Sequence, residues 1–85
     1  MKISINVENG GLKKNRELSG ISQKELSEKT GINLRTIQQY EQGQRDLNGA
    51  KFITLLKICN VLGCSLSAIL TDPETLEELK KYEEF

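Results

Sequence analysis

Apolar residues recur at every third or fourth position along most of the chain, which is the spacing of one face of an α-helix. A first helix is predicted over residues 12–18, with Gly20 placed to end it in the left-handed conformation. A second is predicted over residues 22–31, where Ser22 and Glu25 have the spacing of a capping box. The pattern therefore predicts two short helices in quick succession.

A third helix is predicted to begin after Asn33, a favourable N-cap, and to end at Gly43. A loop at residues 44–48 leads to a fourth helix over about residues 49–62. In that helix four apolar residues form one stripe with helical spacing, Leu55, Ile58, Cys59 and Leu62. We expect this stripe to be buried.

Two shorter helices are predicted after the fourth. Ser65 is placed to cap the fifth, and Asp72-Pro73 puts an N-cap before a proline at the first position of a sixth. The sixth would carry an apolar stripe of Leu76, Leu79 and Tyr82. This stripe either packs back on the bundle or forms a dimer seam, and the sequence leaves both open.

The first residues have a different pattern. Ile3, Ile5 and Val7 alternate with polar residues, as in a strand, until Asn9-Gly10-Gly11 interrupts the alternation. Because a helical domain offers a lone strand no partner, we interpret residues 1–9 as a disordered leader or a strand that pairs with another subunit.

These elements predict an all-α fold, a compact bundle of five or six short helices. The 85 residues suffice for one domain, and with two Phe, two Tyr and no Trp its core must be aliphatic. We expect an N-terminal extension at residues 1–9, a helical domain at 10–71, and an acidic C-terminal helix or tail at 72–85.

Charge is unevenly distributed along a chain whose net charge is zero. Residues 11–51 carry eight basic and five acidic residues, a net charge of +3. Residues 72–85 carry two basic and six acidic residues, a net charge of −4. A mildly basic body before an acidic tail suits a nucleic-acid partner, although a solvated surface can have the same asymmetry.

Several kinds of chemistry are excluded by what the sequence lacks. The chain has no histidine, so imidazole catalysis and a Cys/His zinc site within one chain are excluded. Cys59 and Cys64 are interpreted as small core residues. The sequence contains no apolar run of about 20 residues and no secretion leader. We therefore expect a cytoplasmic protein that is not an enzyme, binds no cofactor or metal, and has no membrane partner.

The second and third predicted helices are joined by only a few residues, with Gly31 at the bend. Small Ser27 lies mid-helix, where a crossing helix can approach closely. The apolar residues placed to hold the pair together are Leu26, Ile32 and Ile37. Residues 22–42 thus have the pattern of a helix-turn-helix, whose second helix enters the major groove of DNA.

Two stretches of this motif, SQKELSEKTGIN at 22–33 and IQQYEQGQR at 37–45, resemble the repressor and Cro proteins of lambdoid phages, often called the XRE family. The resemblance covers about residues 12–70. It implies a lambda-repressor-like bundle of four or five helices, sequence-specific duplex binding, frequent dimerisation and no catalysis.

The resemblance also implies which residues contact DNA. A glutamine that starts the second helix touches phosphate and supports the base readers. The start of the third helix and the positions one turn later face base edges, and the following loop touches phosphate. Carried over to this chain, the residues are Gln23, Asn33, Leu34, Arg35, Thr36, Gln38, Gln39, Gln44 and Arg45.

Side-chain chemistry favours the same helix independently. The fork of Arg35 matches the two acceptors of guanine, a glutamine matches adenine, and Leu34 can pack on a thymine methyl. Asn33 at a helix N-terminus brings free amides to a phosphate. Exposed arginine and glutamine are also ordinary surface residues, and Tyr40 suits packing better than DNA contact.

The chain departs from the family at Ser27, where alanine is usual, and in the loop at residues 44–48. That loop lacks the common proline and is about three residues longer, which leaves the phosphate contacts of Gln44 and Arg45 open.

The leading hypothesis is a homodimeric, repressor-like transcriptional regulator that binds double-stranded DNA. The alternative is an antitoxin or interaction adaptor of the same fold, with a toxin or another protein as partner.

Overall fold

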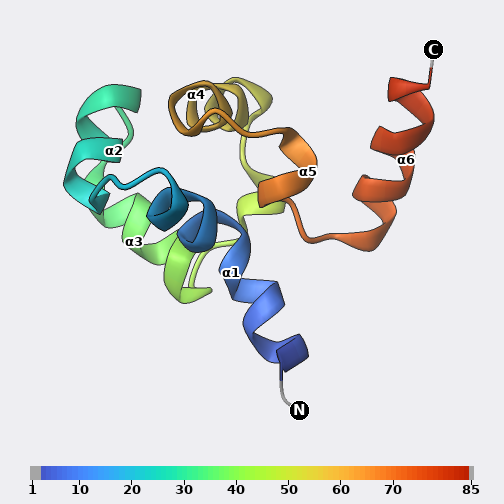
Figure 1. Cartoon of the computed structure of the whole chain (residues 1–85), viewed down its shortest axis with the longest axis horizontal. Helices are drawn as coiled ribbons and strands as arrows, with labels where there is room; N and C mark the ends of the chain where they lie inside the picture. Colours follow the sequence, from blue (N-terminus) through green and yellow to red (C-terminus); the bar gives the residue numbers. More distant parts are fainter. Residues whose placement is uncertain (1–2, 85) are drawn as a thin grey trace.

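A computed structural model describes the backbone of residues 3–84 and the side chains of residues 11–84. The elements follow one another without a strand in this part of the chain (Figure 1): α1 (Ile3–Leu18), α2 (Gln23–Thr30), α3 (Leu34–Gln42), the 3-10 helix η1 (Leu47–Gly49), α4 (Phe52–Leu62), α5 (Leu66–Ile69) and α6 (Pro73–Glu83). The predicted all-α fold is confirmed.

The capping signals at Ser22, Asn33 and Asp72 act as predicted, whereas Ser65 occupies the N-cap position of α5 without a side-chain capping bond. The Ser22 hydroxyl accepts a hydrogen bond from the Glu25 backbone amide at 3.0 Å, and the Glu25 carboxylate accepts from the Ser22 amide at 3.1 Å. Asn33 and Asp72 cap α3 and α6 through their side-chain oxygens. Gly31 ends α2 with a φ of 78°, a conformation that glycine adopts without strain.

The strand predicted at residues 3–7 is wrong, because α1 is already helical from Ile3 and continues through both glycines. Gly11 lies inside the helix because α5 packs directly against it. A Cβ at Gly11 would come within 2.9 Å of the Ile69 carbonyl oxygen, so only glycine allows this approach. The predicted intersubunit contacts of Ile3, Ile5 and Val7 concern side chains outside the described residues.

The fourth helix begins at Phe52 rather than near residue 49. Residues 47–49 instead form η1, whose N-cap is Asp46: its carboxylate accepts from the Asn48 backbone amide at 3.0 Å. Lys51 is extended, with ψ of 147°, and separates η1 from α4. The longer loop after α3 is therefore an ordered turn.

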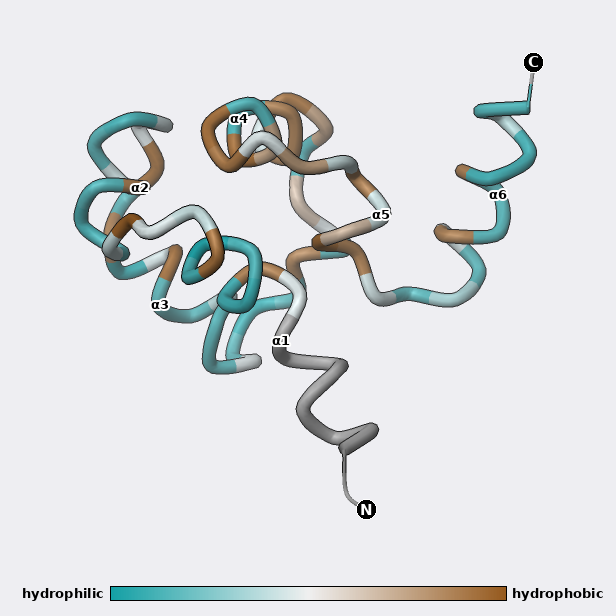
Figure 2. The backbone as a smooth tube through the Cα atoms, in the orientation of Figure 1, coloured by the Kyte–Doolittle hydropathy of each residue, from teal (hydrophilic) through white to brown (hydrophobic). Residues whose placement is uncertain are grey.

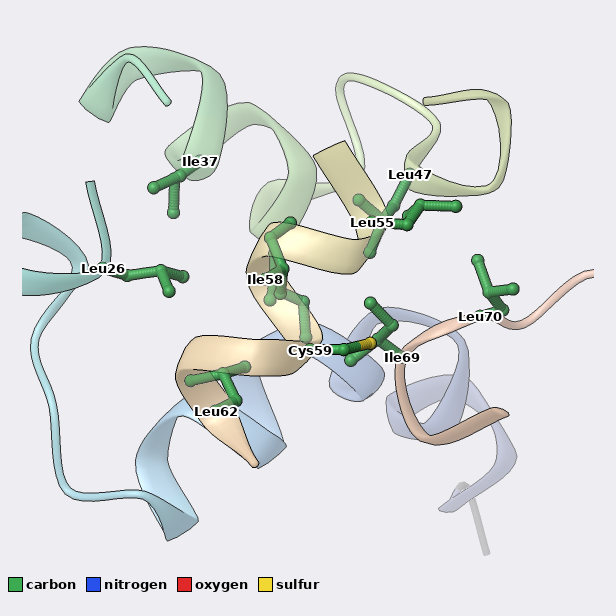
Figure 3. Packing of buried hydrophobic residues seen from close by; sticks show 10 residues of the cluster. Leu26, Ile37, Leu47, Leu55, Ile58, Cys59, Leu62, Ile69 and Leu70 are labelled. Carbon is green, nitrogen blue, oxygen red and sulfur yellow. The ribbon is translucent and has the colours of Figure 1, made fainter. Parts of the chain in front are cut away.

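The core is aliphatic, as predicted, and includes the whole α4 stripe (Figure 3). Its buried apolar residues are Leu12, Leu26, Ile37, Leu47, Leu55, Ile58, Cys59, Leu62, Ile69 and Leu70. Cys59 and Cys64 are free thiols, and burial raises the pKa of the Cys59 thiol to about 12. The α1 helix joins this core through Leu12 and lies against α3 and α5.

The α6 helix stands apart from the other helices, and most of its residues are hydrophilic (Figures 1 and 2). Leu76 packs against the core and Leu79 is half-buried, so the near end of the stripe folds back on the bundle. No residue of α6 is buried. The helix keeps most of its acidic face in solvent.

Candidate nucleic-acid interface

A three-residue turn, residues 31–33, joins α2 to α3. Hydroxyl groups hold this turn: Ser27 Oγ donates to the Ile32 carbonyl at 2.6 Å, and Thr30 Oγ1 accepts from the Ile32 amide at 3.2 Å. Ser27, at the position where alanine is usual in the family, therefore adds a hydrogen bond to the bend. Leu26 of α2 and Ile37 of α3 are fully buried and pack in the core beneath the two helices.

A buried polar network fixes the far end of α3. Arg16 of α1 donates from Nε to Glu41 Oε2 at 2.7 Å and from Nη2 to Oε1 at 3.1 Å. Gln23 of α2 donates from Nε2 to the same Oε1 at 2.9 Å. Only 10% of the Arg16 side chain and 3% of the Glu41 side chain are exposed. Three helices therefore meet at one carboxylate. Charge-assisted, two-pronged hydrogen bonds of this kind are strong and directional, so they fix the relative positions of the helices.

The same arginine also orders the segment that leads into α2. Arg16 Nη1 donates to the Ile21 carbonyl at 2.9 Å, so the guanidinium serves two sites. The hydrogen bond to Glu41, opposed by burial, raises the pKa of Arg16 above its already high ordinary value. The cation is therefore permanent.

Sequence reasoning missed Arg16 and Glu41, although a signal was present. Arg16 follows buried Leu12 by four residues, and Glu41 follows buried Ile37 by four, so each charge lies on an inward helical face. The predicted site residue Gln23 is half-buried at the start of α2, and its amide donates into this network. Its contact with phosphate stays a prediction.

The outer face of α3 carries four polar side chains in one stripe at helical spacing: Arg35, Gln38, Gln39 and Gln42. Arg35 is exposed, and within the described residues its guanidinium makes no hydrogen bond or ion pair. Gln38 and Gln39 are half-buried, and Gln42, which sequence reasoning did not select, is exposed. The structure thus brings three predicted base readers together on the side opposite Ile37 and Glu41.

The remaining predicted base readers lie at the start of α3. Asn33 Oδ1 accepts from the Arg35 backbone amide at 2.8 Å, so this oxygen is used by the cap. Leu34 is 36% exposed, which leaves an apolar surface beside Arg35. Thr36 is half-buried on the flank of the helix. The arrangement keeps the first turn of α3 accessible.

The loop after α3 is tied to the helix itself. Gln44 and Arg45 are exposed, and their backbone amides donate to the Gln39 carbonyl at 2.9 and 3.2 Å. Arg45 Nε also donates to Gln39 Oε1 at 3.1 Å. A predicted phosphate contact and a predicted base reader are therefore bonded to each other, which spacing along the sequence does not reveal.

Asn48, which sequence reasoning also missed, anchors the other end of this loop. Its Oδ1 accepts from the amides of Thr71 and Asp72 at 2.8 and 3.0 Å, and its Nδ2 donates to Asp46 Oδ1 at 2.9 Å. The additional loop residues thus dock on the junction between α5 and α6. A cavity of about 260 Å³ lies between the loop, α1 and this junction.

A comparison with protein families matches residues 12–69, more than half of the chain, to the helix-turn-helix family. The chain belongs to this family. It is a helix-turn-helix protein of the XRE, lambda-repressor-like type, and DNA-binding transcription regulation is the role of that type. Searches among curated proteins and solved structures returned no match.

In the part of the chain that the structure describes, no helix combines the length and the apolar composition needed to span a bilayer. No three or more Cys, Asp or Glu side chains in that part of the chain are grouped to hold a metal ion.

Proposed function

We propose that this helix-turn-helix protein is a sequence-specific regulator that occupies an operator in double-stranded DNA as a repressor does, with α3 in the major groove. The observation that carries the proposal is the stripe of Arg35, Gln38, Gln39 and Gln42 on a helix whose opposite face is fixed in the core. Arginine and glutamine are the side chains that pair with base edges in two-pronged fashion. A rigid helix that presents them is suited to reading sequence.

The proposal includes a homodimer on DNA. One recognition helix reads only a few base pairs, and the basic excess of the body is too small for tight binding by one copy. Phe52 and Ile53, 62% and 55% exposed, are adjacent large apolar residues at the start of α4 and are our candidate for the contact between copies. Sedimentation of the Phe52→Ser/Ile53→Ser protein should show weaker self-association, and unchanged association would remove this contact.

Selection of bound duplexes from a random pool tests the function. We expect a two-fold symmetric site with half-sites about 34–36 Å apart, one helical turn. Arg35→Ala should lose about 1–3 kcal/mol of discrimination at one base pair of each half-site. The matched control is Lys57→Ala, which removes an exposed cation from α4. If Arg35→Ala keeps every base preference, the groove assignment of α3 is wrong.

The second candidate function is an antitoxin or adaptor that binds a protein. The observation that favours it is α6, an acidic helix that stands apart from the bundle and carries Leu79 only half-buried. Deleting residues 73–85 separates the two functions: a regulator keeps its DNA site, whereas an adaptor loses its partner. A wild-type protein that binds no duplex at low salt would leave the adaptor as the remaining candidate.

A further inference from the structure

We propose that Arg45 is a specificity-determining positioning residue: it holds the Gln39 amide so that Gln39 reads hydrogen-bond acceptors, and therefore guanine in preference to adenine. This inference rests on the proposed DNA-reading function and deepens it. Taken separately, Gln39 would be a reader of adenine and Arg45 a sequence-independent phosphate contact. Their hydrogen bond makes them one unit.

The backbone brings the two side chains together before they interact. Gly43 turns the chain at the end of α3 with a φ of 80°. The amides of Gln44 and Arg45 then both donate to the Gln39 carbonyl, at 2.9 and 3.2 Å. The Arg45 side chain thus starts beside Gln39 and reaches Oε1 with Nε at 3.1 Å. Because the backbone is already fixed, little conformational freedom remains to be lost when the side chains pair.

This bond determines which way the Gln39 amide faces. A glutamine amide has one acceptor oxygen and one donor NH2 group, whereas a guanidinium has donors only. The oxygen must therefore face Arg45, and the NH2 group is turned away from it. A free glutamine rotates about its last side-chain bond and presents either group, but Gln39 held by Arg45 presents the donor.

The fixed donor matches one purine better than the other. In the major groove guanine offers two acceptors, N7 and O6, whereas adenine offers N7 beside an amino donor. Reading adenine with both groups of a glutamine requires its oxygen as an acceptor, and here one lone pair of that oxygen already accepts from Arg45 Nε, which directs the oxygen toward the cation. The free N–H groups of Arg45 are donors as well, so the whole Gln39–Arg45 edge is suited to acceptors.

The test is binding by Arg45→Ala, with Lys51→Ala as the matched control. Lys51 is an exposed cation close to the same loop, and its side chain makes no capping bond. Gln39→Ala first maps the base pair that Gln39 reads on the selected site. At that pair we expect wild type to prefer guanine over adenine roughly tenfold, and to lose this affinity when 7-deazaguanine removes the N7 acceptor.

Arg45→Ala should abolish or reverse that preference, whereas Lys51→Ala should keep it. The Gln39→Ala/Arg45→Ala protein should lose no further preference at this pair, because the two residues act as a unit. In the free protein, the side-chain amide NMR signals of Gln39 should shift in Arg45→Ala and stay in place in Lys51→Ala.

Three results would overturn the inference. Arg45→Ala with every base preference intact would refute it and leave the proposed DNA-reading function standing. Unchanged Gln39 amide signals in Arg45→Ala would refute the positioning in the free protein. A wild-type protein with no preferred duplex would refute both the inference and the proposed function.

Discussion

Replacing Glu41 by alanine removes the carboxylate at which α1, α2 and α3 meet. Arg16 would keep its charge with only 10% of its side chain exposed, and the Gln23 amide would lose its acceptor. Leaving one member of a buried ion pair without its partner costs about 3–5 kcal/mol. A domain of 85 residues has a free energy of unfolding of roughly 4–13 kcal/mol. The substitution should therefore remove a large part of the stability.

Urea unfolding followed by far-UV circular dichroism measures this loss. Glu28→Ala, which removes an exposed glutamate from α2, is the control and should change the free energy of unfolding by no more than about 0.5 kcal/mol. Arg16→Met/Glu41→Leu removes both charges and should cost less than Glu41→Ala alone, since no unpaired charge stays buried. A Glu41→Ala protein whose free energy of unfolding lies within about 1 kcal/mol of wild type would refute the reasoning, as would an Arg16→Met/Glu41→Leu protein that loses more stability than Glu41→Ala.

Three further predictions concern packing, thiol chemistry and pH. Gly11→Ala should lower the free energy of unfolding by about 1–3 kcal/mol because its Cβ meets the Ile69 carbonyl, whereas Gly49→Ala, which points into open space, should be neutral or stabilising by up to about 1 kcal/mol in the same urea assay. Cys59, whose pKa is raised to about 12, should resist alkylation at neutral pH until urea unfolds the chain; mass spectrometry showing equal rates in native and unfolded protein would contradict this. Hydrogen bonds from the Thr75 hydroxyl and amide lower the pKa of Asp72, so the cap of α6 should contribute fully above the ordinary Asp pKa of 3.8 and be lost as the pH falls through the lower folded-state pKa; carboxyl NMR that titrates Asp72 at or above 3.8 would disprove it.

The ends of α2 and α3 were predictable from the sequence because their causes are local. The capping box at Ser22 and Glu25 and the cap at Asn33 involve residues within three positions of each other. The same locality misled the interpretation of the N-terminus. Next to Asn9 and Gly10, Gly11 looks like a helix breaker. The reason for a glycine inside this helix is the close approach of the Ile69 backbone, 58 positions away.

The sequence predicts which side chains of the candidate site share a face, but not which partners they have. Residue type and helical spacing indicate that Arg35, Gln38 and Gln39 share a face, because that depends on α3 alone. Tertiary folding decides the partners of these side chains. The Gln39–Arg45 hydrogen bond depends on how the loop turns at Gly43. The residues around Gln39 in the sequence do not indicate that its side-chain amide will have this partner.

The two faces of α3 have consequences for how such a protein can change over evolution. Ile37 and Glu41 determine where the helix sits, whereas Arg35, Gln38 and Gln42 have no part in the core or in the ion pair. In the proposed regulator, mutations at these three positions would alter the preferred DNA site while stability is conserved, so descendants would acquire new target genes by single steps. Gln39 is the exception among the outward residues, because a new side chain there must also suit position 45. Change at this one point of the reading surface should therefore occur in pairs.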